Sequence, residues 1–573
     1  PDLLKGDQDD PKVYELLNSL DTQGVFQLES DGMRKLISRQ KPDCFADLVA
    51  LLALFRPGPL DANMDVLFVN RKHGREEIKY EHPALESILE ETYGSIVYQE
   101  QVMQISSDLA GFSLAEADNL RKAMGKKIPA IMKKFSSQFV EGSVKNGCDK
   151  YVAQKIWDNI LKFGGYGFNK SHSAAYAILS YQTAWMKAHY RREFLAANMS
   201  CEMSDSDKIK ALIDDARSAG IEVLQPNLQH SHWGFVPEGE GIRYGLGAIK
   251  GTGQQAVENL IRARDELQAE GKALGLFELT NRTDPKEIGK IAWDAIIKAG
   301  GFDFTELNRG CVHTSLEGAL ADGAKAAADR RSGQANLFGA LEEESGTADE
   351  MSSTEGAWAR QELLDNEFSV LGHYLSGHPL EKRAGLLSLL SNATSRTAAD
   401  RSGEEKVVLA GMIRELEEKV IQNGQNAGKK MAKFRLEDLL GNVSVTCFSR
   451  AYGECREDLA DGEIVIVSGK MEDDSESPNL HLKEVMTLED ALQRFEGGLV
   501  VPVTPEDMDL LPELQEIFQR HPGRQSVYLQ VRGDDGTTRR IRAGSQCRIS
   551  ISEPFAQEVD ALLGKGRVSL TRS

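Results

Sequence analysis

The sequence predicts a multidomain protein of mixed α+β class. Its 573 residues are enough for several separate hydrophobic cores. Residues 1 to about 405 carry mainly helical spacing of apolar residues. From Lys406 the pattern changes to short alternating strands joined by glycine and asparagine turns, and from Leu499 strand and helix patterns alternate. We therefore expect a mainly helical region, then a closed barrel of about five strands of the OB type, then a small α+β module.

Composition restricts the protein class. The hydrophobic fraction of 41% and the charged fraction of 27% are typical of globular protein. A net charge of -20 means that any nucleic-acid contact must come from local basic patches. The seven cysteines include no CxxC pair, which argues against a disulfide framework or a zinc site and favours the reducing cytoplasm. No apolar run suits membrane insertion or export. The chain opens at Pro1 as if entered partway, so we expect part of the molecule to be missing.

The stretch from Phe163 to Tyr190 is the centre of the functional prediction. Glycines 164, 165 and 167 precede a long helix, and Ser171 or Ser173 is the predicted N-cap. The helix should bury the face that carries Ala175, Ile178, Leu179, Trp185 and Met186. Its N-terminus gathers polar side chains suited to phosphates, namely Tyr166, Asn169, Lys170 and His172. The alternative is a glycine-rich loop that only caps a core helix.

Two upstream elements carry further cations. Pro57 and Pro59 should end a helix and leave Arg56 at its C-terminal tip, where it would favour the helix dipole. Between Asp118 and Lys134, six lysines or arginines face one acid and bracket Gly125 as a flexible point. The cations nearest this point are Arg121, Lys122, Lys126 and Lys127. They could converge on one polyanion or form a solvated helix face. Between these elements, residues 93–103 read as an apolar segment that runs into a helix.

A glycine turn farther along predicts a second phosphate contact. After a helix at 208–220 and three short strand-like segments, Lys250 is followed by Gly251, Thr252 and Gly253, and a helix begins at Gln254. This pattern is typical of a helix-hairpin-helix motif, whose backbone N–H groups hold a DNA phosphate without reading sequence. A plain turn between packed helices is the alternative.

Residues 315–333 and 341–357 have compositions that predict weak structure. Between them, QANLF offers Leu337 and Phe338 for insertion into a partner's apolar pocket, with Gln334 at its edge. In the barrel, single-strand stacking would require aromatic side chains, and only Phe434, Phe448 and Tyr452 are available, so a purely structural barrel stays open. The terminal module shows no catalytic cluster and reads as an interaction domain.

These motifs, in this order, resemble the alpha subunit family of bacterial DNA polymerase III, the C-family replicative polymerases. The resemblance rests on GVFQLES, LFRPGP, VYQEQVM, LRKAMGKK, FGGYGFNKSHSAAYA, GLGAIKGTG, QANLF, LGHYLSGHP and the barrel. It implies fingers at 1–205, a clamp-binding domain with the helix-hairpin-helix at 206–355, a helical connection at 356–404, an OB-fold domain at 405–497 and a tau-binding-like domain at 498–573.

The resemblance also implies roles for the candidate residues. The nucleotide pocket of a DNA-directed DNA polymerase would be lined by Arg121, Lys122, Lys126, Lys127, Tyr166, Asn169, Lys170 and His172, with Arg56 a weaker candidate. Lys250, Gly251, Thr252 and Gly253 would hold the backbone of primer-template DNA. Gln334, Leu337 and Phe338 would dock on the sliding clamp, although Asn336 replaces the small polar residue or aspartate expected there. The terminal module would bind the clamp-loader tau subunit, and other polymerase III holoenzyme subunits would also be partners.

One departure from the family pattern concerns catalysis. The palm signature PDxDxDF, whose aspartates hold two magnesium ions, is not found in the sequence, nor is the PHP domain expected before it. The resemblance therefore implies that Mg²⁺ ligands lie outside this chain, which alone should not extend primers. The alternative is a non-catalytic scaffold that binds DNA and clamp. A phosphate-binding metabolic enzyme would need a Rossmann or P-loop signature, and neither is present.

Overall fold

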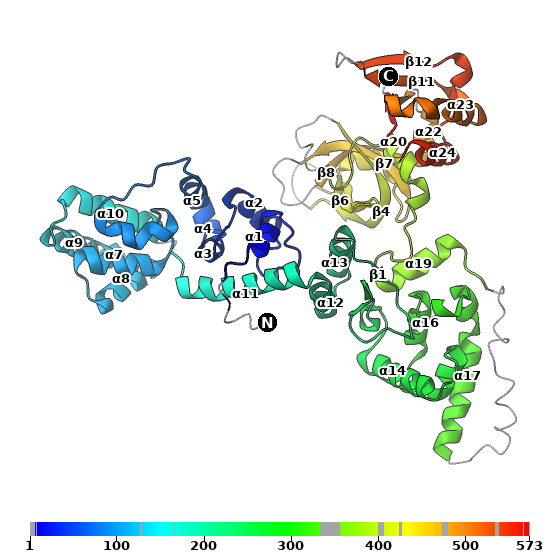
Figure 1. Cartoon of the computed structure of the whole chain (residues 1–573), viewed down its shortest axis with the longest axis horizontal. Helices are drawn as coiled ribbons and strands as arrows, with labels where there is room; N and C mark the ends of the chain where they lie inside the picture. Colours follow the sequence, from blue (N-terminus) through cyan, green and yellow to red (C-terminus); the bar gives the residue numbers. More distant parts are fainter. Residues whose placement is uncertain are drawn as a thin grey trace. The chain divides into compact units, whose positions relative to one another are not determined.

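The computed structural model describes residues 6, 8–126, 129–164, 167–332, 356–398, 401, 406–422, 427–472, 479–494, 497–532, 538–564 and 567–571. The chain forms two compact units, Pro1–Leu375 and Ser376–Ser573. The first is mainly helical and the second contains the barrel and the terminal module, as the sequence predicted. Figure 1 shows the elements of both units. No described helix combines the length and apolar character needed to cross a membrane.

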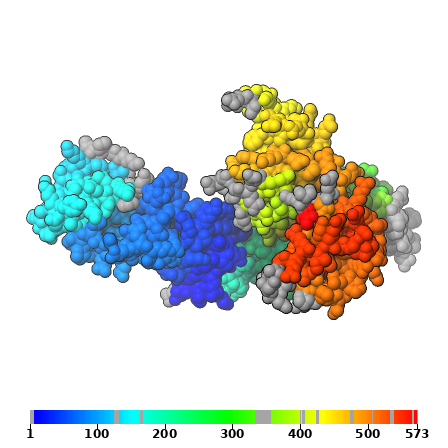
Figure 2. All heavy atoms as spheres, turned by 90° about the horizontal axis from the view of Figure 1, so that it is seen from above, coloured from blue at the N-terminus to red at the C-terminus, as the bar shows by residue number. Residues whose placement is uncertain are grey.

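The first core of the N-terminal unit forms around one long helix. Helix α11, Lys170–His189, packs against α3 and α1, which come from the opening part of the chain. The helices of this core are α1 (Pro11–Asn18), α2 (Asp31–Gln40), α3 (Phe45–Leu54), α4 (Pro57–Asp61), α5 (Met64–Lys72) and α11. The dark-blue surface of the opening part of the chain continues into the lighter-blue segment that follows it in the sequence (Figure 2).

The buried face of α11 differs from the predicted one. Leu179 and Met186 are 47% and 37% exposed, and Ala175 is also exposed. The side chains that face the core are Ser173, Ala177, Ser180, Tyr181, Ala184 and Lys187. Small residues let α11 approach α3 closely, so the buried face follows small side chains rather than large apolar ones. The predicted core face was therefore wrong for Ala175, Leu179 and Met186, whereas Trp185 is partly buried and packs against this core.

A second core forms a helical bundle between α5 and α11 in the sequence. Its elements are α6 (Glu86–Leu89), α7 (Gln99–Ala110), α8 (Leu114–Lys126), α9 (Pro129–Lys145) and α10 (Lys150–Gly164). Trp157, Phe139 and Ile105 are almost fully buried at its centre. The predicted segment at 93–103 runs into α7 as expected. Gly125, predicted as a flexible point, instead lies inside α8.

A third core follows α11 and contains the predicted strand segments. Strands β1 (Val223–Leu224), β2 (Val236–Glu238) and β3 (Gly241–Arg243) form a small sheet in the order β1-β3-β2. The helices are α12 (Arg191–Cys201), α13 (Ser206–Ser218), α14 (Gln254–Ala269), α15 (Leu276–Arg282), α16 (Lys290–Lys298), α17 (Arg309–Ser332) and α19 (Arg360–Leu371). The prediction of weak structure at 315–333 was wrong up to Ser332, because the alanine-rich sequence has high helix propensity and α17 packs on α15.

The second unit begins with α20 (Ala384–Leu390) and a closed five-stranded barrel in the order β4-β5-β6-β8-β7. Its strands are β4 (Val407–Val420), β5 (Lys430–Glu437), β6 (Asn442–Cys447), β7 (Ile464–Met471) and β8 (Asn479–Thr487), with α21 (Ser449–Cys455) after β6 and α22 (Leu488–Arg494) after β8. Inward residues such as Val445, Val465 and Leu480 are buried, so alternation along the strands fills the barrel.

The terminal module combines a four-stranded sheet, in the order β12-β11-β9-β13, with two amphipathic helices. Its elements are β9 (Gly498–Val503), α23 (Leu511–Arg520), β10 (Pro522–Gln525), β11 (Val527–Arg532), β12 (Thr538–Arg542), α24 (Glu553–Leu563) and β13 (Ser569–Thr571). The predicted alternation of strands and helices is confirmed.

Candidate functional site

Two segments far apart in the sequence meet at the start of α11. Tyr98 and Phe168 form an isolated parallel bridge. The N–H of Phe168 donates to the carbonyl of Val97 at 3.0 Å, and the N–H of Gln99 donates to the carbonyl of Phe168 at 2.9 Å. The side chain of Gln99 also donates to the carbonyl of Gly167 at 3.0 Å. The VYQEQVM and YGFNKSH motifs therefore form one structural feature.

The N-terminus of α11 is capped by Asn169, not by Ser171 or Ser173 as predicted. The side-chain oxygen of Asn169 accepts from the N–H of His172 at 2.8 Å. Its amide group donates to Oε1 of Glu100 at 2.8 Å, and Oε2 of Glu100 accepts from the N–H of Lys170 at 2.9 Å. A carboxylate therefore already lies at the helix N-terminus, where a negative charge is favoured.

The ammonium of Lys170 lies between an aromatic ring and an acid. Its Nζ is 2.7 Å from Oε2 of Glu91 and 5.5 Å from the ring centroid of Tyr98. The lysine side chain is 40% exposed and Glu91 is 36% exposed. The ion pair is therefore open to water and to exchange with another anion.

Arg56 approaches the same site from a different element. It lies at the C-terminal end of α3, as predicted, because α3 ends at Leu54 and Nε of Arg56 donates to the carbonyl of Ala53 at 2.9 Å. It is also the N-cap of α4. Its guanidinium lies 4.2 Å from the ring centroid of Phe168, and burial lowers the pKa of Arg56. The ring of Phe168 also meets His172 edge-on at 5.4 Å, and His172 lies 4.4 Å from Tyr176. Arg56 and His172 thus flank one aromatic side chain.

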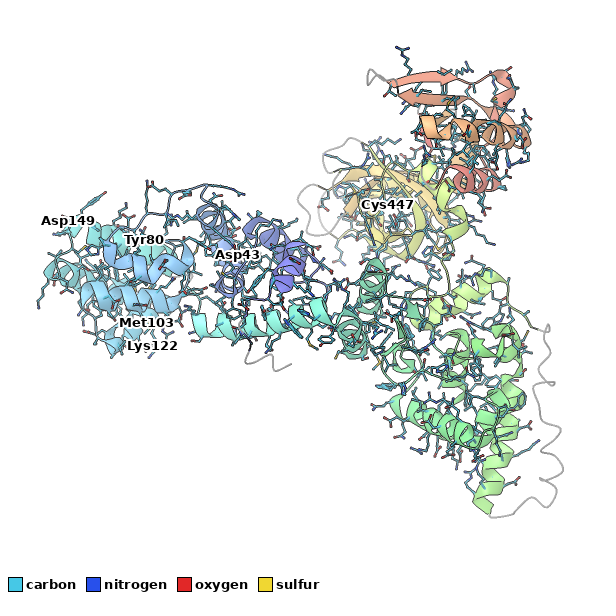
Figure 3. The ribbon with its side chains drawn as sticks, in the orientation of Figure 1. Asp43, Tyr80, Met103, Lys122, Asp149 and Cys447 are labelled. Carbon is cyan, nitrogen blue, oxygen red and sulfur yellow. The ribbon has the colours of Figure 1, made fainter. Side chains whose placement is uncertain are left out.

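The basic cluster reaches this site through α8. The guanidinium of Arg121 donates to Oε1 of Gln99 at 3.3 Å and to Oδ1 of Asp118 at 2.8 Å. Lys122 pairs with Oδ2 of Asp118 at 2.7 Å, and these two cations lower the pKa of Asp118. Figure 3 labels Lys122 on the bundle. Gln99 therefore connects Arg121 to the turn that precedes α11.

The structure brings together Arg56, Arg121, Asn169, Lys170 and His172, with Lys122 beside Arg121. The backbone of Lys126 lies in α8, and the structure gives no side-chain position for it. Lys127 and Tyr166 lie outside the described residues, as do Gln334, Leu337 and Phe338. Gln99, Glu91, Glu100 and Phe168 also belong to the site but were not predicted from the sequence. The amides and the acid in VYQEQVM could have indicated that this motif takes part.

The predicted glycine turn forms a second polar site. Helix α14 begins at Gln254 as predicted, after the three-residue 3₁₀ helix Leu246–Ala248 and the N-cap Gly253. Gly251 has a φ of 97°, which favours glycine. Lys250, Gly251 and Gly253 are exposed, and Gly253, as the N-cap, has no side chain with which to cap the first N–H groups of α14.

Hydrogen bonds to neighbouring backbone carbonyl groups stabilise this glycine turn. The hydroxyl of Thr252 lies 2.8 Å from the carbonyl oxygens of Leu246 and Ile249, while the N–H of Lys250 donates to Val370 at 2.8 Å. Thr252 therefore supports the turn, whereas Lys250 and the two glycines are accessible to a ligand.

The outer face of the barrel has mixed charge. A hollow of about 330 Å³ is lined by Lys433 and Arg435 but also by Glu415, Glu417 and Glu472. Phe434 and Tyr452, two of the three aromatic candidates, are 3% and 5% exposed and belong to the core. Phe448 is 47% exposed and lies 5.1 Å from His481. Phe448 alone of the three predicted aromatics is available for stacking.

Sequence profiles of known families match three of these regions. Residues 2–147 match the bacterial DNA polymerase III alpha subunit finger domain. Residues 220–312 match a helix-hairpin-helix motif, and residues 407–488 match an OB-fold nucleic acid binding domain. Across 98% of its length the chain is 38% identical to DNA polymerase III subunit alpha of Escherichia coli K12. The chain is related to the alpha subunit of bacterial DNA polymerase III.

Other DNA polymerase III alpha subunits give the same result. The chain is 38% identical to the Haemophilus influenzae subunit and 36% identical to the Vibrio cholerae subunit, over 98% of its own length in each case. These matches cover 49% of each relative. The chain therefore spans about half the length of the curated relatives it matches.

The similarity to DNA polymerase III alpha subunits implies magnesium, which a protein holds through carboxylate oxygens. Within the described residues, one group of three possible metal ligands lies close together, Asp43, Cys44 and Asp47. The ammonium of Lys72 pairs with Asp47 and lies 3.5 Å from Asp43. Magnesium prefers oxygen ligands, whereas this group contains a thiol and is already neutralised by a lysine. These residues do not fit a catalytic magnesium site; Figure 3 labels Asp43.

Proposed function

We propose that this chain supplies nucleotide binding and primer-template binding in template-directed DNA synthesis. The observation that carries the proposal is the position of Gln99. Its side chain accepts from Arg121 at 3.3 Å and donates to Gly167 at 3.0 Å, so the basic helix and the polar turn meet at one residue. The finger-domain match covers Gln99 and Arg121.

An incoming deoxynucleotide triphosphate would exchange with the carboxylates that now neutralise the cations. Asp118 holds Arg121 and Lys122, and Glu91 holds Lys170. These pairs are partly exposed, and such pairs contribute at most about 1 kcal/mol. A triphosphate presents several charges to both groups at once and would make bidentate contacts with the guanidinium. Asn169 and His172 would orient it at the start of α11.

The remaining candidates of the nucleotide pocket stay within this proposal. Lys126 and Lys127 belong to the LRKAMGKK motif and would extend the cationic surface, while Tyr166 belongs to YGFNKSH and would offer its hydroxyl to the nucleotide. Arg56 would act through Phe168, by holding the ring against His172. It would therefore position the turn rather than contact the phosphates.

Primer-template DNA would be held by the glycine turn at 250–253. The accessible N–H groups at the start of α14 and the ammonium of Lys250 suit one phosphate of the duplex backbone. The mixed charge of the barrel face favours weak, stacking-based contact with single strands through Phe448.

The proposed protein partners follow from the family resemblance of the sequence motifs. QANLF would dock on the sliding clamp through Gln334, Leu337 and Phe338. The terminal module would bind the clamp-loader tau subunit, and the assembly would include other polymerase III holoenzyme subunits. These partners are soluble replication proteins, so the proposed location is the cytoplasm.

Magnesium chemistry would be supplied by carboxylates outside this sequence. We expect no primer extension by the isolated chain, because lysines and helix termini orient a triphosphate but do not place the metal ions. Magnesium-dependent extension by the isolated chain would contradict this part of the proposal.

The experiment that tests nucleotide binding compares two lysines in a polymerase that contains this chain and its catalytic domain. Lys170→Ala should raise the KM for nucleotides about tenfold, because one ammonium contact with phosphate is lost. Lys155→Ala is the matched control. Lys155 lies on α10, away from the start of α11, and it also pairs with a glutamate, Glu81, at 2.7 Å. An unchanged KM for Lys170→Ala would remove this residue from the pocket. Nucleotide-independent DNA and clamp binding would favour the scaffold alternative.

A further inference from the structure

Two thiols meet inside the barrel at the beginning and the end of α21. Cys447 is the last residue of β6 and Cys455 is the last residue of α21. Their sulfur atoms are 3.6 Å apart, and the two residues are 0% and 6% exposed. All seven cysteines of the chain are free. Figure 3 labels Cys447 within the barrel.

We propose that Cys447 and Cys455 are a redox-modification site that forms an intramolecular disulfide when the protein meets a peroxide. A disulfide needs a sulfur–sulfur distance of about 2.05 Å, which rotation about the two Cα–Cβ bonds can approach from the observed separation. The two residues are only eight positions apart, so the bond closes a small loop. No backbone of another domain has to move.

Exposure and pKa give the two thiols different roles. The two sulfur atoms lie in hydrogen-bonding contact, in which either thiol can donate, and this contact lowers the pKa of Cys455 against the opposing effect of burial. The same contact, together with burial, raises the pKa of Cys447. Cys455 is also the less buried of the two. Since the thiolate is the nucleophile, Cys455 reacts first and Cys447 resolves the product.

The reaction is balanced with one peroxide molecule. The Cys455 thiolate attacks one peroxide oxygen, the O–O bond breaks, and hydroxide leaves and becomes water by taking the first thiol proton. Cys455 is then a sulfenic acid. The Cys447 sulfur attacks the Cys455 sulfur, the S–O bond breaks, and the second thiol proton leaves with the oxygen in a second water. Two thiols are oxidised to one disulfide while hydrogen peroxide is reduced to two waters.

The disulfide would fix a helix that carries the exposed aromatic residue of the barrel. Phe448 is the N-cap of α21 and contacts His481, while the hydroxyl of Tyr452 donates to Glu418 at 2.6 Å. Both aromatic residues lie between the two cysteines in the sequence. A covalent bond between the ends of this segment would restrict unwinding of α21 and thereby hold Phe448 in place.

Mass spectrometry of the full chain tests the proposal. The protein would be treated with hydrogen peroxide while folded, alkylated and digested with trypsin. Trypsin cleaves after Arg450, so a Cys447–Cys455 disulfide joins the peptides 436–450 and 451–456, and their summed mass falls by two hydrogen atoms. We expect this linked pair to increase with peroxide and to disappear on reduction. Oxidation of exposed Cys44 and Cys201 without the linked pair would overturn the proposal.

Two variants test the assigned order. Cys447→Ser should trap Cys455 as a sulfenic acid and raise its labelling by dimedone several-fold, whereas Cys455→Ser should leave Cys447 unlabelled. Buried Cys547 in the terminal module is the internal control and should stay unlabelled throughout. Equal labelling of the two cysteines in the two variants would overturn the order. A linked pair that forms only after denaturation would overturn the site itself.

Discussion

The ammonium of Lys187 is fully buried and lies 2.9 Å from a carboxylate oxygen of Asp215. It also lies 2.7 Å from Asp21 and donates to the carbonyl of Gln23 at 2.9 Å. Two carboxylates and one backbone carbonyl, from two other segments, therefore surround the ammonium of one lysine on α11. This cluster joins α11 to α13, which belongs to the third core.

Removing Lys187 should strongly weaken the connection between α11 and α13. Lys187→Met leaves buried Asp215 without its principal cation, and breaking a buried pair costs about 3–5 kcal/mol. We expect hydrogen exchange in α11 and α13 of the intact chain to become correspondingly faster. Lys208→Met is the control, because Lys208 is 55% exposed in its pair with Glu202 and its loss should leave hydrogen exchange nearly unchanged. Unchanged protection in Lys187→Met would contradict the assigned role.

The two faces of α11 should respond oppositely to substitution. Leu179→Ala should change stability by less than about 0.5 kcal/mol, because this leucine is 47% exposed. Ala184→Leu should destabilise by about 1–3 kcal/mol, because the added side chain has no space in the close contact between α11 and its neighbours. Thermal unfolding and hydrogen exchange of α3 and α11 would measure both effects. A larger loss of stability for Leu179→Ala would instead support the buried face of α11 that was predicted from the sequence.

The glycine turn should contribute one phosphate contact to duplex binding. Lys250→Ala should lower affinity for all duplex sequences alike and reduce the salt dependence by about one phosphate contact. Gly251→Ala should reduce affinity further, because a φ of 97° strains a residue that carries a Cβ. Fluorescence anisotropy at several salt concentrations measures both changes. Lys272→Ala, near the other end of α14, is the control and should leave the salt slope unchanged.

Acid should release a specific connection in the terminal module. Asp507 accepts from Arg567 at 2.7 and 2.6 Å, and these contacts, followed by those from Thr504, lower its pKa. The stabilising contribution is therefore present above the ordinary aspartate pKa of about 3.9 and is lost as the pH falls through the lower folded value. Asp507→Asn should speed hydrogen exchange in β9 at neutral pH, and the difference from the unmodified chain should shrink in acid. An equal difference at both pH values would exclude this ionisation as the cause.

The sequence predicted the elements better than their contacts. The barrel, the terminal module, α14 and the start of α7 follow from strand alternation, glycine turns and helical spacing. The buried face of α11 did not, because apolar spacing identifies Leu179 and Met186 but does not show that small Ala177 and Ser180 permit closer packing. Residues 315–332 are rich in alanine, lysine and aspartate, which suggested weak structure, but the helix propensity of alanine and packing on α15 make them part of α17.

The sequence predicted the motifs of the candidate site but not the acidic residues that pair with them. Arg121, Asn169 and Lys170 were identified from residue type, since cations and a helix N-terminus suit phosphates. Their partners Asp118, Glu100 and Glu91 come from other positions, and only the folded chain shows that Glu100 reaches the N–H of Lys170. Asn169 was predicted to belong to the site but not to be the N-cap of α11, because Ser171 and Ser173 are equally suitable N-cap residues at the start of the same helix.

The hydrogen-bonded bridge between Tyr98 and Phe168 lies where the chain passes between the first core and the helical bundle. Val97 and Tyr98 belong to the first core, and Phe168 packs against it, whereas α7 to α10 build a core of their own. Glu100 on α7 accepts from the side chain of Asn169 and from the N–H of Lys170. The bundle therefore supplies the carboxylate at the start of a helix that belongs to the first core, so displacing the bundle would expose the N-terminus of α11.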